Sequence, residues 1–222
     1  MEENPPFPKT TFLNLPPEKR ANIVQAAVAE FAGQGYQRAS VNNIARELGI
    51  AKGSLYQYFD NKESLFLYVF DRFTEKVKQH VREAVAGLEG RDFFATARQV
   101  LLAAIDFIDT HPEYFQVYLK VLFEQDVPRR QELVARVRLF SLEFFGPLCE
   151  NARRQGQLRS DISCRQVVFL LDATMERFLQ GYAQPCLDGV LGLGVMPGRR
   201  LHEEIDTIIR VLQNGLQPEN KG

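Results

Sequence analysis

A short polar segment, KGSLYQY at residues 52–58, carries the side chains of this chain that are best suited to binding chemistry. Lys52 can pair with a phosphate or with the edge of a guanine, and Ser54 and Gln57 are polar groups short enough to hydrogen-bond base edges. Gly53 has no side chain, so a nucleic-acid backbone can approach the main chain closely there. This combination predicts a surface that contacts a nucleic acid.

Two tyrosines and a second lysine extend the same predicted surface. Tyr56 and Tyr58 offer hydroxyl groups to phosphate oxygens, and such contacts position a protein on a duplex without reading its sequence. Lys62 stands at the start of a following helix, where free backbone amides favour an anion. We therefore expect phosphate contacts at these three positions.

The polar segment needs a rigid support, and the residues around it have helical spacing. Ser40 is suited to cap the N-terminus of a first helix, and Gly49 is suited to end it in a left-handed conformation. The first helix has an apolar stripe at Val41, Ile44, Ala45 and Leu48, and the second has a narrower one at Ala51, Leu55 and Phe59. Two helices joined in this way form a helix-turn-helix unit, whose second helix enters the DNA major groove.

The rest of the chain also shows helical periodicity, and no segment alternates with period two over a useful length. A helix that begins near Pro16 and Pro17 is expected to end at Gly33 and Gly35. Further helix starts are predicted from three capping boxes, Asp60 with Glu63, Thr110 with Glu113, and Ser163 with Gln166. The predicted fold is all-α, with about nine helices.

Three segments are expected along the chain. Residues 1–15 hold several prolines and little periodicity, which indicates a flexible N-terminal arm, although Phe12, Leu13 and Leu15 could dock on the body. Residues 16–62 form the predicted three-helix, helix-turn-helix DNA-binding domain. Residues 63–217 form a larger helical domain.

Composition excludes several other classes of protein. The chain has 222 residues, 45% hydrophobic and 25% charged, with a net charge of −1, which argues against a binder that is basic all over. It has no membrane-length apolar stretch and no signal-peptide pattern, so we expect a cytoplasmic protein without membrane contact. Three cysteines, Cys149, Cys164 and Cys186, lack metal-ligand spacing and are interpreted as small buried hydrophobic residues, with a redox role as the alternative. Nothing indicates a cofactor, a metal or a catalytic site, so we do not expect an enzyme.

The stretch from Glu18 to Phe66, which contains ASVNNIARELGIAKGSLYQYFDNKESLF, resembles the N-terminal domain of the TetR family of bacterial transcriptional regulators. The family pattern has Ser or Thr before the second helix, IA…LG at the turn, KG[ST]LYxYF in the recognition helix and K[ED]xL opening the fourth helix. One departure is Ala51, where other members often place a serine. The residues thereby assigned to DNA contact are Ser40, Lys52, Gly53, Ser54, Tyr56, Gln57, Tyr58 and Lys62.

The resemblance implies a homodimer that binds a palindromic operator in double-stranded DNA through the helix at 51–58. In this family the last two long helices form the dimer interface, which corresponds here to residues 163–184 and 199–215. The apolar stripes of these helices suit either a core or a partner. The predicted interface residues are Leu171, Met175, Phe178, Ile205, Ile208 and Leu212.

The resemblance also implies a small-molecule effector, bound in the C-terminal domain, that releases a repressor from its operator. The middle of the chain is rich in aromatic residues, which line apolar pockets and ordinary cores alike. The abundance of Phe and the absence of Trp favour an apolar or aromatic effector. The candidate pocket residues are Phe94, Phe107, Tyr114, Tyr118, Phe144 and Phe178. The alternative is a DNA-binding regulator without a small effector, controlled by a protein partner.

Overall fold

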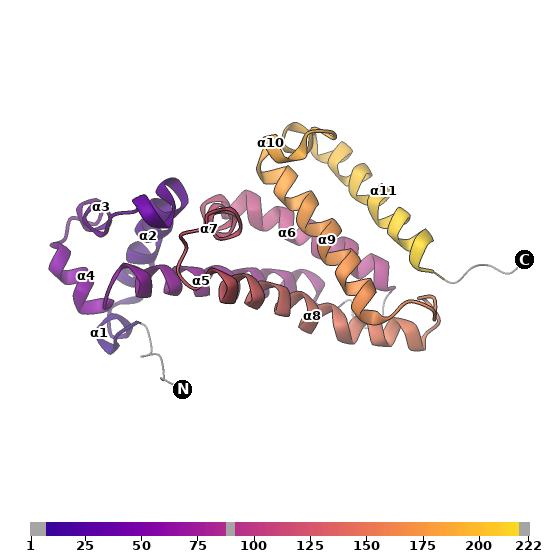
Figure 1. Cartoon of the computed structure of the whole chain (residues 1–222), viewed down its shortest axis with the longest axis horizontal. Helices are drawn as coiled ribbons and strands as arrows, with labels where there is room; N and C mark the ends of the chain where they lie inside the picture. Colours follow the sequence, from indigo (N-terminus) through magenta and orange to yellow (C-terminus); the bar gives the residue numbers. More distant parts are fainter. Residues whose placement is uncertain (1–7, 88–91, 218–222) are drawn as a thin grey trace, which may run out of the picture. The chain divides into compact units, whose positions relative to one another are not determined.

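The computed structural model describes residues 8–87 and 92–217, and within these ranges the chain is helical without any strand (Figure 1). The all-α prediction is therefore confirmed. Nine helices are seven residues or longer, which matches the expected number for the described part of the chain. The described part also contains the four-residue helices α1 and α10 and the 3-10 helix η1.

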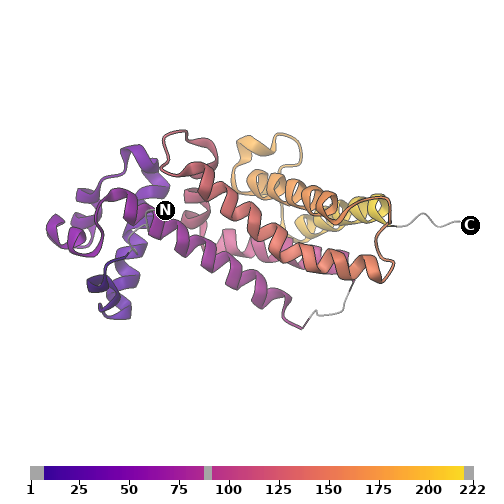
Figure 2. The same cartoon turned by 60° about the horizontal axis from the view of Figure 1, so that its bottom comes forward.

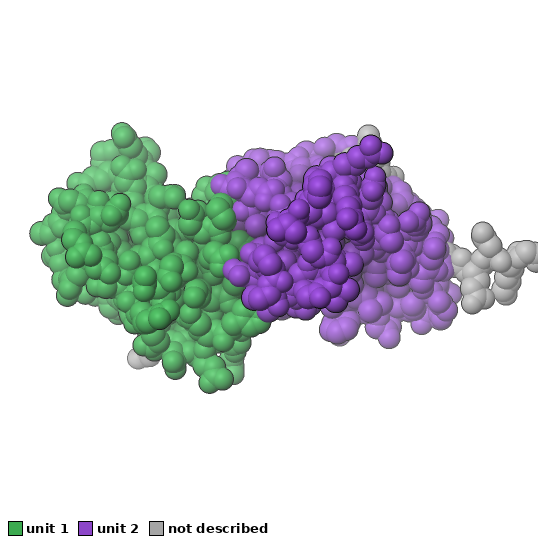
Figure 3. Space-filling view, turned by 90° about the horizontal axis from the view of Figure 1, so that it is seen from above, with its two compact units in different colours: residues 1–76, 111–134 green, residues 77–110, 135–222 purple. Residues whose placement is uncertain are grey.

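The chain forms two compact units that are not contiguous in sequence (Figure 3). Unit 1 comprises Met1–Lys76 and His111–Val134, and unit 2 comprises Val77–Thr110 and Ala135–Gly222. The expected boundary at residue 62 therefore does not separate them, because a helix from the second half of the chain packs with the N-terminal helices. Helices α5 (Lys62–Val85) and α8 (Arg130–Arg154) each contribute residues to both units.

Unit 1 contains the predicted helix-turn-helix. Helix α3 packs between α2 and α4, α1 lies against α4, and α7 packs against α2 (Figure 1). Proline begins α2, where its missing N–H costs nothing. The bounds are α1 Thr10–Leu13, α2 Pro17–Arg38, α3 Val41–Glu47, α4 Lys52–Tyr58 and α7 Pro112–Phe123.

Helix α2 continues past Gly33 and breaks at Gly35 (φ 69°, ψ 174°), the second of the two glycines that were expected to end it, with a last turn to Arg38. The cause lies far away in sequence. The carboxylate of Glu124, at the end of α7, accepts a hydrogen bond from the backbone N–H of Tyr36 at 3.3 Å. The positive φ of Gly35 favours glycine, and a Cβ there would also displace the carboxylate of Glu124 from its present position.

The described part of the predicted flexible arm, residues 8–15, is packed rather than free. Phe12 is fully buried. Its ring lies 5.0 Å from that of Phe59, 5.3 Å from Tyr68 and 6.1 Å from Tyr58 (centroid to centroid). Residues 1–7 lie outside the described part of the chain.

Two of the three expected capping boxes are replaced by other arrangements. Helix α5 is capped by Asn61, whose Oδ1 accepts from the Ser64 backbone N–H at 2.8 Å, while the Ser64 hydroxyl accepts from the Asn61 N–H at 3.2 Å. Asp60 instead pairs with Lys9 at 2.7 Å. Thr110 is the last residue of α6, and His111 precedes α7 without a side-chain cap.

The third capping box is confirmed, because Ser163 and Gln166 exchange side-chain and backbone hydrogen bonds at the start of α9. This helix belongs to unit 2, where α6 contacts both α9 and α11. Figures 1 and 2 show α9 leading through α10 into α11. The bounds are α6 Phe93–Thr110, α9 Cys164–Ala183, α10 Pro185–Asp188, η1 Leu193–Val195 and α11 Gly198–Leu216.

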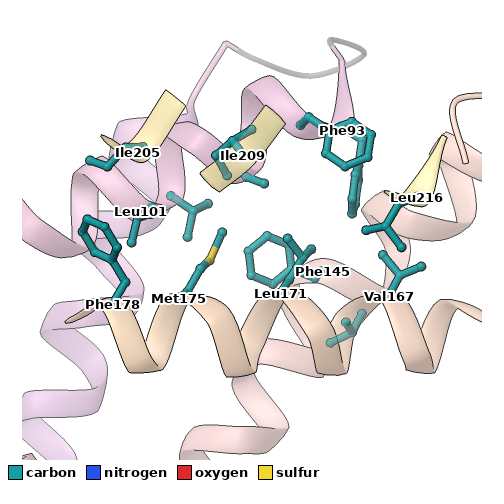
Figure 4. Packing of buried hydrophobic residues seen from close by; sticks show 14 of the residues in the cluster. Phe93, Leu101, Phe145, Val167, Leu171, Met175, Phe178, Ile205, Ile209 and Leu216 are labelled. Atoms are coloured by element: carbon teal, nitrogen blue, oxygen red, sulfur yellow. The ribbon is translucent and has the colours of Figure 1, made fainter. Parts of the chain in front are cut away.

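The core of unit 2 is apolar and is drawn from α6, α8, α9 and α11 (Figure 4). Leu171 and Met175 of α9 point toward Ile205 and Ile209 of α11, with Leu101 of α6 beside them. Burial of such side chains contributes about 1.5–3 kcal/mol each to the free energy of unfolding. This cluster therefore supplies the stability that holds α11 on the rest of unit 2.

The cysteines differ from one another in exposure. Cys149 is buried, Cys164 is half-buried and Cys186 is exposed, so the expectation of three buried cysteines is wrong for Cys186. Burial, with the neighbouring Cys164 side chain as the second cause, raises the pKa of the Cys149 thiol to about 12. Cys149 is therefore an inert, protonated packing residue at neutral pH.

Within the described ranges, none of the helices combines the length and the apolar character needed to cross a membrane. The same ranges hold no cluster of three or more His, Cys, Asp or Glu side chains arranged for a metal ion.

Candidate nucleic-acid interface

Helix α4 is anchored by few residues, which leaves most of its surface to solvent. Leu55 and Phe59 are 1% and 2% exposed and hold the helix against the rest of unit 1. Ala51 precedes the helix and has no side-chain oxygen to cap it. The apolar spacing of four residues therefore fixes which face of α4 points outward.

The outward face of α4 presents the residue types predicted for DNA contact. Lys52, Gly53, Tyr56 and Gln57 are exposed, and Ser54 is half-buried. The ammonium of Lys52 lies 5.7 Å from the centre of the Tyr56 ring, so the two side chains share one patch. A Cβ at Gly53 would meet nothing within 4 Å in the described chain, so the space beside it is open to an approaching ligand.

Tyr58 is placed differently from the other predicted contacts. Its side chain is only 8% exposed and its ring packs against that of Phe12. The structure therefore gives Tyr58 a packing role on α4, and its predicted phosphate contact stays a prediction.

The ammonium of Lys62 is also occupied within the protein. It donates hydrogen bonds to the backbone carbonyls of Tyr36 at 2.8 Å, Gln37 at 3.1 Å and Ala39 at 3.2 Å. It also lies 4.5 Å from the centre of the Tyr36 ring. A lysine has three N–H donors, and these carbonyls at the end of α2 accept from all of them, so Lys62 fastens α5 to α2.

Ser40 lies at the N-terminus of α3, as expected, but its side chain does not cap the helix. Its backbone N–H donates instead to Glu30 Oε1 at 2.8 Å, and Asn43 Nδ2 donates to the same oxygen at 3.1 Å. The side-chain oxygen of Asn43, Oδ1, accepts a hydrogen bond from the Arg46 guanidinium at 2.8 Å. Arg46 thus adds an exposed cation on α3 that the sequence pattern alone did not assign to the interface.

Sequence reasoning also missed the residues that cap the C-terminal end of α4. The ammonium of Lys9 donates to the Tyr56 carbonyl at 2.9 Å, and the Lys9 backbone N–H donates to the Tyr58 carbonyl at 3.0 Å. The Thr11 hydroxyl donates to the Gln57 carbonyl. These donors satisfy carbonyls that a helix end leaves free, and the positive charge of Lys9 is favourable there.

The six candidate pocket residues are divided between the units. Tyr114 and Tyr118 lie in unit 1, where the Tyr118 ring stacks on that of Phe73 at 5.4 Å. The other four lie in unit 2, and all but the half-buried Phe144 are buried there: Phe94, Phe107, Phe144 and Phe178. The pocket role of each of the six stays a prediction.

The candidate dimer residues face mainly into their own protomer. Leu171, Met175, Phe178 and Ile205 are buried in the core of unit 2, and Ile208 and Leu212 pack partly against it. The exposed apolar residues on the same two helices are others: Phe169 is 70% exposed, Leu170 40% and Val211 66%.

Comparison with known proteins gives one family match, to the model described as bacterial regulatory proteins of the tetR family, over residues 23–69. This range spans most of α2, all of α3 and α4, and the start of α5. It therefore covers the interface described above.

Similar proteins match over most of the chain. The probable acrEF/envCD operon repressor of Escherichia coli K12 is 23% identical over 170 residues, which cover 73% of this chain and 75% of that protein. A TetR family transcriptional regulator from Chloroflexus aurantiacus is 28% identical, with a TM-score of 0.75, and covers 96% of this chain and 100% of that one. FadR from Bacillus subtilis, solved with stearoyl-CoA, has the same fold at 17% identity, with a TM-score of 0.69 over 88% and 98% of the two chains.

Three observations indicate the same kind of protein. Helix α4 exposes polar residues, the family model matches the segment that contains it, and a TetR family regulator shares the fold over nearly the whole chain. Residues 23–69 are therefore those of a DNA-binding segment of the tetR family of bacterial regulatory proteins, and the chain is similar over most of its length to TetR family transcriptional regulators.

Proposed function

We propose that the protein is a homodimeric repressor that binds a palindromic operator through α4 and is released by a small effector. The observation that carries the proposal is the outward face of α4, which exposes a cation, a tyrosine and an amide around a glycine. Two such helices related by two-fold symmetry read half-sites about 34–36 Å apart. An inverted-repeat operator follows from that symmetry.

On this proposal the exposed residues have separate roles. Gln57 and Ser54 read base edges in the major groove. Lys52 and Tyr56 contact phosphates and set the register of the helix on the duplex. Gly53 lets the helix backbone come close to the DNA, because no side chain stands between them.

The proposed dimer uses the outward faces of α9 and α11. Phe169 and Leu170 on α9 and Val211 on α11 are apolar and exposed in the protomer. The proposal places these side chains against the partner protomer, which would remove their apolar surface from water. The buried stripe that suggested the interface in the sequence holds the two helices in place instead.

The effector is proposed to act through the connection between α6 and α7. Only His111 separates these helices, so a displacement at the end of α6 moves the start of α7. Helix α7 in turn packs on α2 and holds it through Glu124. Two similar structures are named for lipid-related molecules: FadR of Bacillus subtilis is solved in complex with stearoyl-CoA, and KstR2 of Mycobacterium tuberculosis is called a ketosteroid transcriptional regulator.

The test is selection of binding sites from random duplex DNA at low salt with the full-length protein. The proposal predicts enrichment of paired, inverted half-sites and a complex that contains two protomers. Enrichment of a single, unpaired half-site would contradict the two-fold arrangement. Retention of all sequences alike would contradict sequence-specific reading by α4.

A further inference from the structure

Unit 2 contains a surface cleft of about 610 Å³ that the proposed DNA and dimer contacts do not use. Drug-sized ligands occupy pockets of about 300–1,000 Å³, so the cleft is large enough for a small molecule. Its walls come from α5, α6, α9, α11 and the residues just before α11. All of these segments belong to one compact unit.

One side of the cleft is polar and carries two carboxylates. Asp106 and Asp109 are three residues apart on α6, so they share one face of the helix. The Nε2 atom of His80 lies 2.9 Å from Asp106 Oδ2, and the Tyr182 hydroxyl donates to Asp109 Oδ1 at 2.7 Å. His202 of α11 also lines the cleft.

The Tyr182 hydroxyl keeps its proton at neutral pH. Burial, and then the hydrogen bond to Asp109, raise the pKa of the Tyr182 hydroxyl to about 12. Tyr182 is therefore a neutral donor to the Asp109 side chain. A carboxylate has several acceptor sites, so one hydrogen bond from Tyr182 does not exhaust those of Asp109.

The other side of the cleft is apolar. Leu102 and Ile105 of α6, Leu201 of α11 and Met196 line it. Ile105 and Leu201 are each only 6% exposed, so they form a floor rather than a rim. An apolar body bound here would remove both its own surface and that of the floor from water, which is favourable.

The charges of the lining discriminate between ligand classes. The residues around the cleft include two carboxylates and, among those described, neither Lys nor Arg. Arg98, on the same helix, is held by Asp206 outside the lining. A ligand with a carboxylate or phosphate would meet two carboxylates and find no Lys or Arg in the lining, whereas a ligand with an ammonium group would meet opposite charge.

We propose that this cleft binds an amphipathic amine, with its ammonium group at Asp106 and Asp109 and its apolar body on Ile105, Leu102 and Leu201. This inference rests on the proposed function, because the amine is then the effector that controls operator binding. The sequence predicted an apolar or aromatic effector, and the cleft adds the requirement that this effector also carries a positive charge. The proposed ligand therefore differs in charge from the anionic stearoyl-CoA that is bound in the FadR structure.

The first experiment compares three probes that share one apolar body: 4-phenylbutylamine, 4-phenylbutanol and 4-phenylbutanoate. Their affinities for the full-length protein are measured by isothermal titration calorimetry at neutral pH and fixed ionic strength. The amine is expected to bind about tenfold more tightly than the carboxylate, with the alcohol between them. Equal affinities, or tighter binding of the carboxylate, would overturn the proposal.

The second experiment places the ammonium group within the cleft. Asp109→Asn removes the carboxylate and keeps an oxygen that can accept from Tyr182. Asp106→Asn removes the second carboxylate, at a side chain that is 64% exposed and therefore tolerant of change. Each is expected to reduce the preference for the amine over the alcohol by about threefold or more, while the affinity for the alcohol is unchanged. The matched control is Glu150→Gln, an exposed carboxylate of α8 outside the cleft, which should change nothing. An unchanged preference in both cleft variants would contradict the site.

The third experiment links the cleft to DNA, with the operator found by selection. Addition of 4-phenylbutylamine should release the wild-type protein from that operator and should leave the Asp106→Asn complex bound at the same concentration. If the protein binds an operator but the amine releases both proteins alike, the cleft proposal fails and the regulator remains. If no operator is found, the proposed function fails, while the calorimetric comparison still decides whether the cleft prefers amines.

Discussion

At the scale of single residues, a cation close to a DNA-binding helix can have a structural role instead of a DNA contact. The Lys62 ammonium donates to three carbonyls at the end of α2, whereas Lys52 is exposed beside Tyr56. Both lysines lie within residues 23–69, which match the family model, and the sequence predicts a DNA contact for each of them. Their surroundings separate the one that holds helices together from the one that is free to meet a phosphate.

Replacing each lysine by methionine tests this difference. Lys62→Met should lower the free energy of unfolding by about 1–3 kcal/mol, because hydrogen bonds from a charged donor are lost. It should leave the salt dependence of DNA binding unchanged. Lys52→Met should leave stability unchanged and reduce the salt slope by about one unit. Chemical denaturation and binding titrations at several salt concentrations measure both quantities, and a reduced salt slope in Lys62→Met would restore it as a phosphate contact.

At the scale of helices, the N-terminal segment holds the end of the recognition helix. Lys9 and Thr11 donate to the last carbonyls of α4, and the ring of Phe12 packs against those of Phe59 and Tyr68. We infer that α1 fixes the direction in which α4 points. This role is not visible in the sequence, because a helix of four residues is too short to show a periodic pattern.

The contribution of α1 is measurable with two neighbouring substitutions. Phe12→Ala removes a fully buried ring and should lower the free energy of unfolding by about 3 kcal/mol. It should also weaken binding to all DNA sequences, because α4 loses its support. Leu13→Ala, at a side chain that is 50% exposed, should change stability by no more than about 0.5 kcal/mol. Equal thermal stabilities for the two variants would show that α1 is not part of the folded unit.

The two glycines of α2 provide a second test at this scale. Gly35→Ala should destabilise the protein by about 1–2 kcal/mol or more, because its φ of 69° is unfavourable for alanine and its Cβ would overlap Glu124. Gly33→Ala lies in regular helix with open space around it and should stabilise by about 0.5–1 kcal/mol. Adding Glu124→Ala to Gly35→Ala should recover the part of the loss that is due to overlap. A destabilising Gly33→Ala would contradict the placement of the break at Gly35.

These glycines also show how far the sequence predicts the fold. Helical spacing around Leu55 and Phe59 is local, so the two helices of the DNA-binding unit and their outward faces follow from it. The break at Gly35 is accompanied by a contact with Glu124, which is distant in sequence and therefore absent from any local pattern. The cap of α5 is similar, because Asp60 and Asn61 are both good caps and the pairing of Asp60 with Lys9 leaves the position to Asn61.

At the scale of the whole molecule, α9 and α11 each carry both buried and exposed apolar residues. Leu171 and Ile205 pack within the protomer, while Phe169 and Val211 are exposed. A sequence pattern reports that a helix has an apolar side, and it does not report whether the same chain or a second copy covers it. For this reason the predicted interface helices are retained in the proposal and the residues are not.

Substitution of one residue from each group tests the proposed dimer. Phe169→Glu should give a folded monomer that binds operator weakly, because the charge lies on the proposed interface. Leu171→Glu should instead unfold unit 2, since its side chain is completely buried. Sedimentation velocity and circular dichroism distinguish these results. An intact dimer in Phe169→Glu would move the interface away from this face of α9.

The central claim is that the exposed face of α4 reads DNA, and the most direct test compares binding-site selection by the wild-type protein and by Gln57→Ala. Both proteins should enrich inverted repeats from random duplexes. The variant should lose about 1–3 kcal/mol of base discrimination at one position in each half-site and keep the rest. Identical selection profiles would remove Gln57 from the readout, and the absence of any inverted repeat with the wild-type protein would contradict the account as a whole.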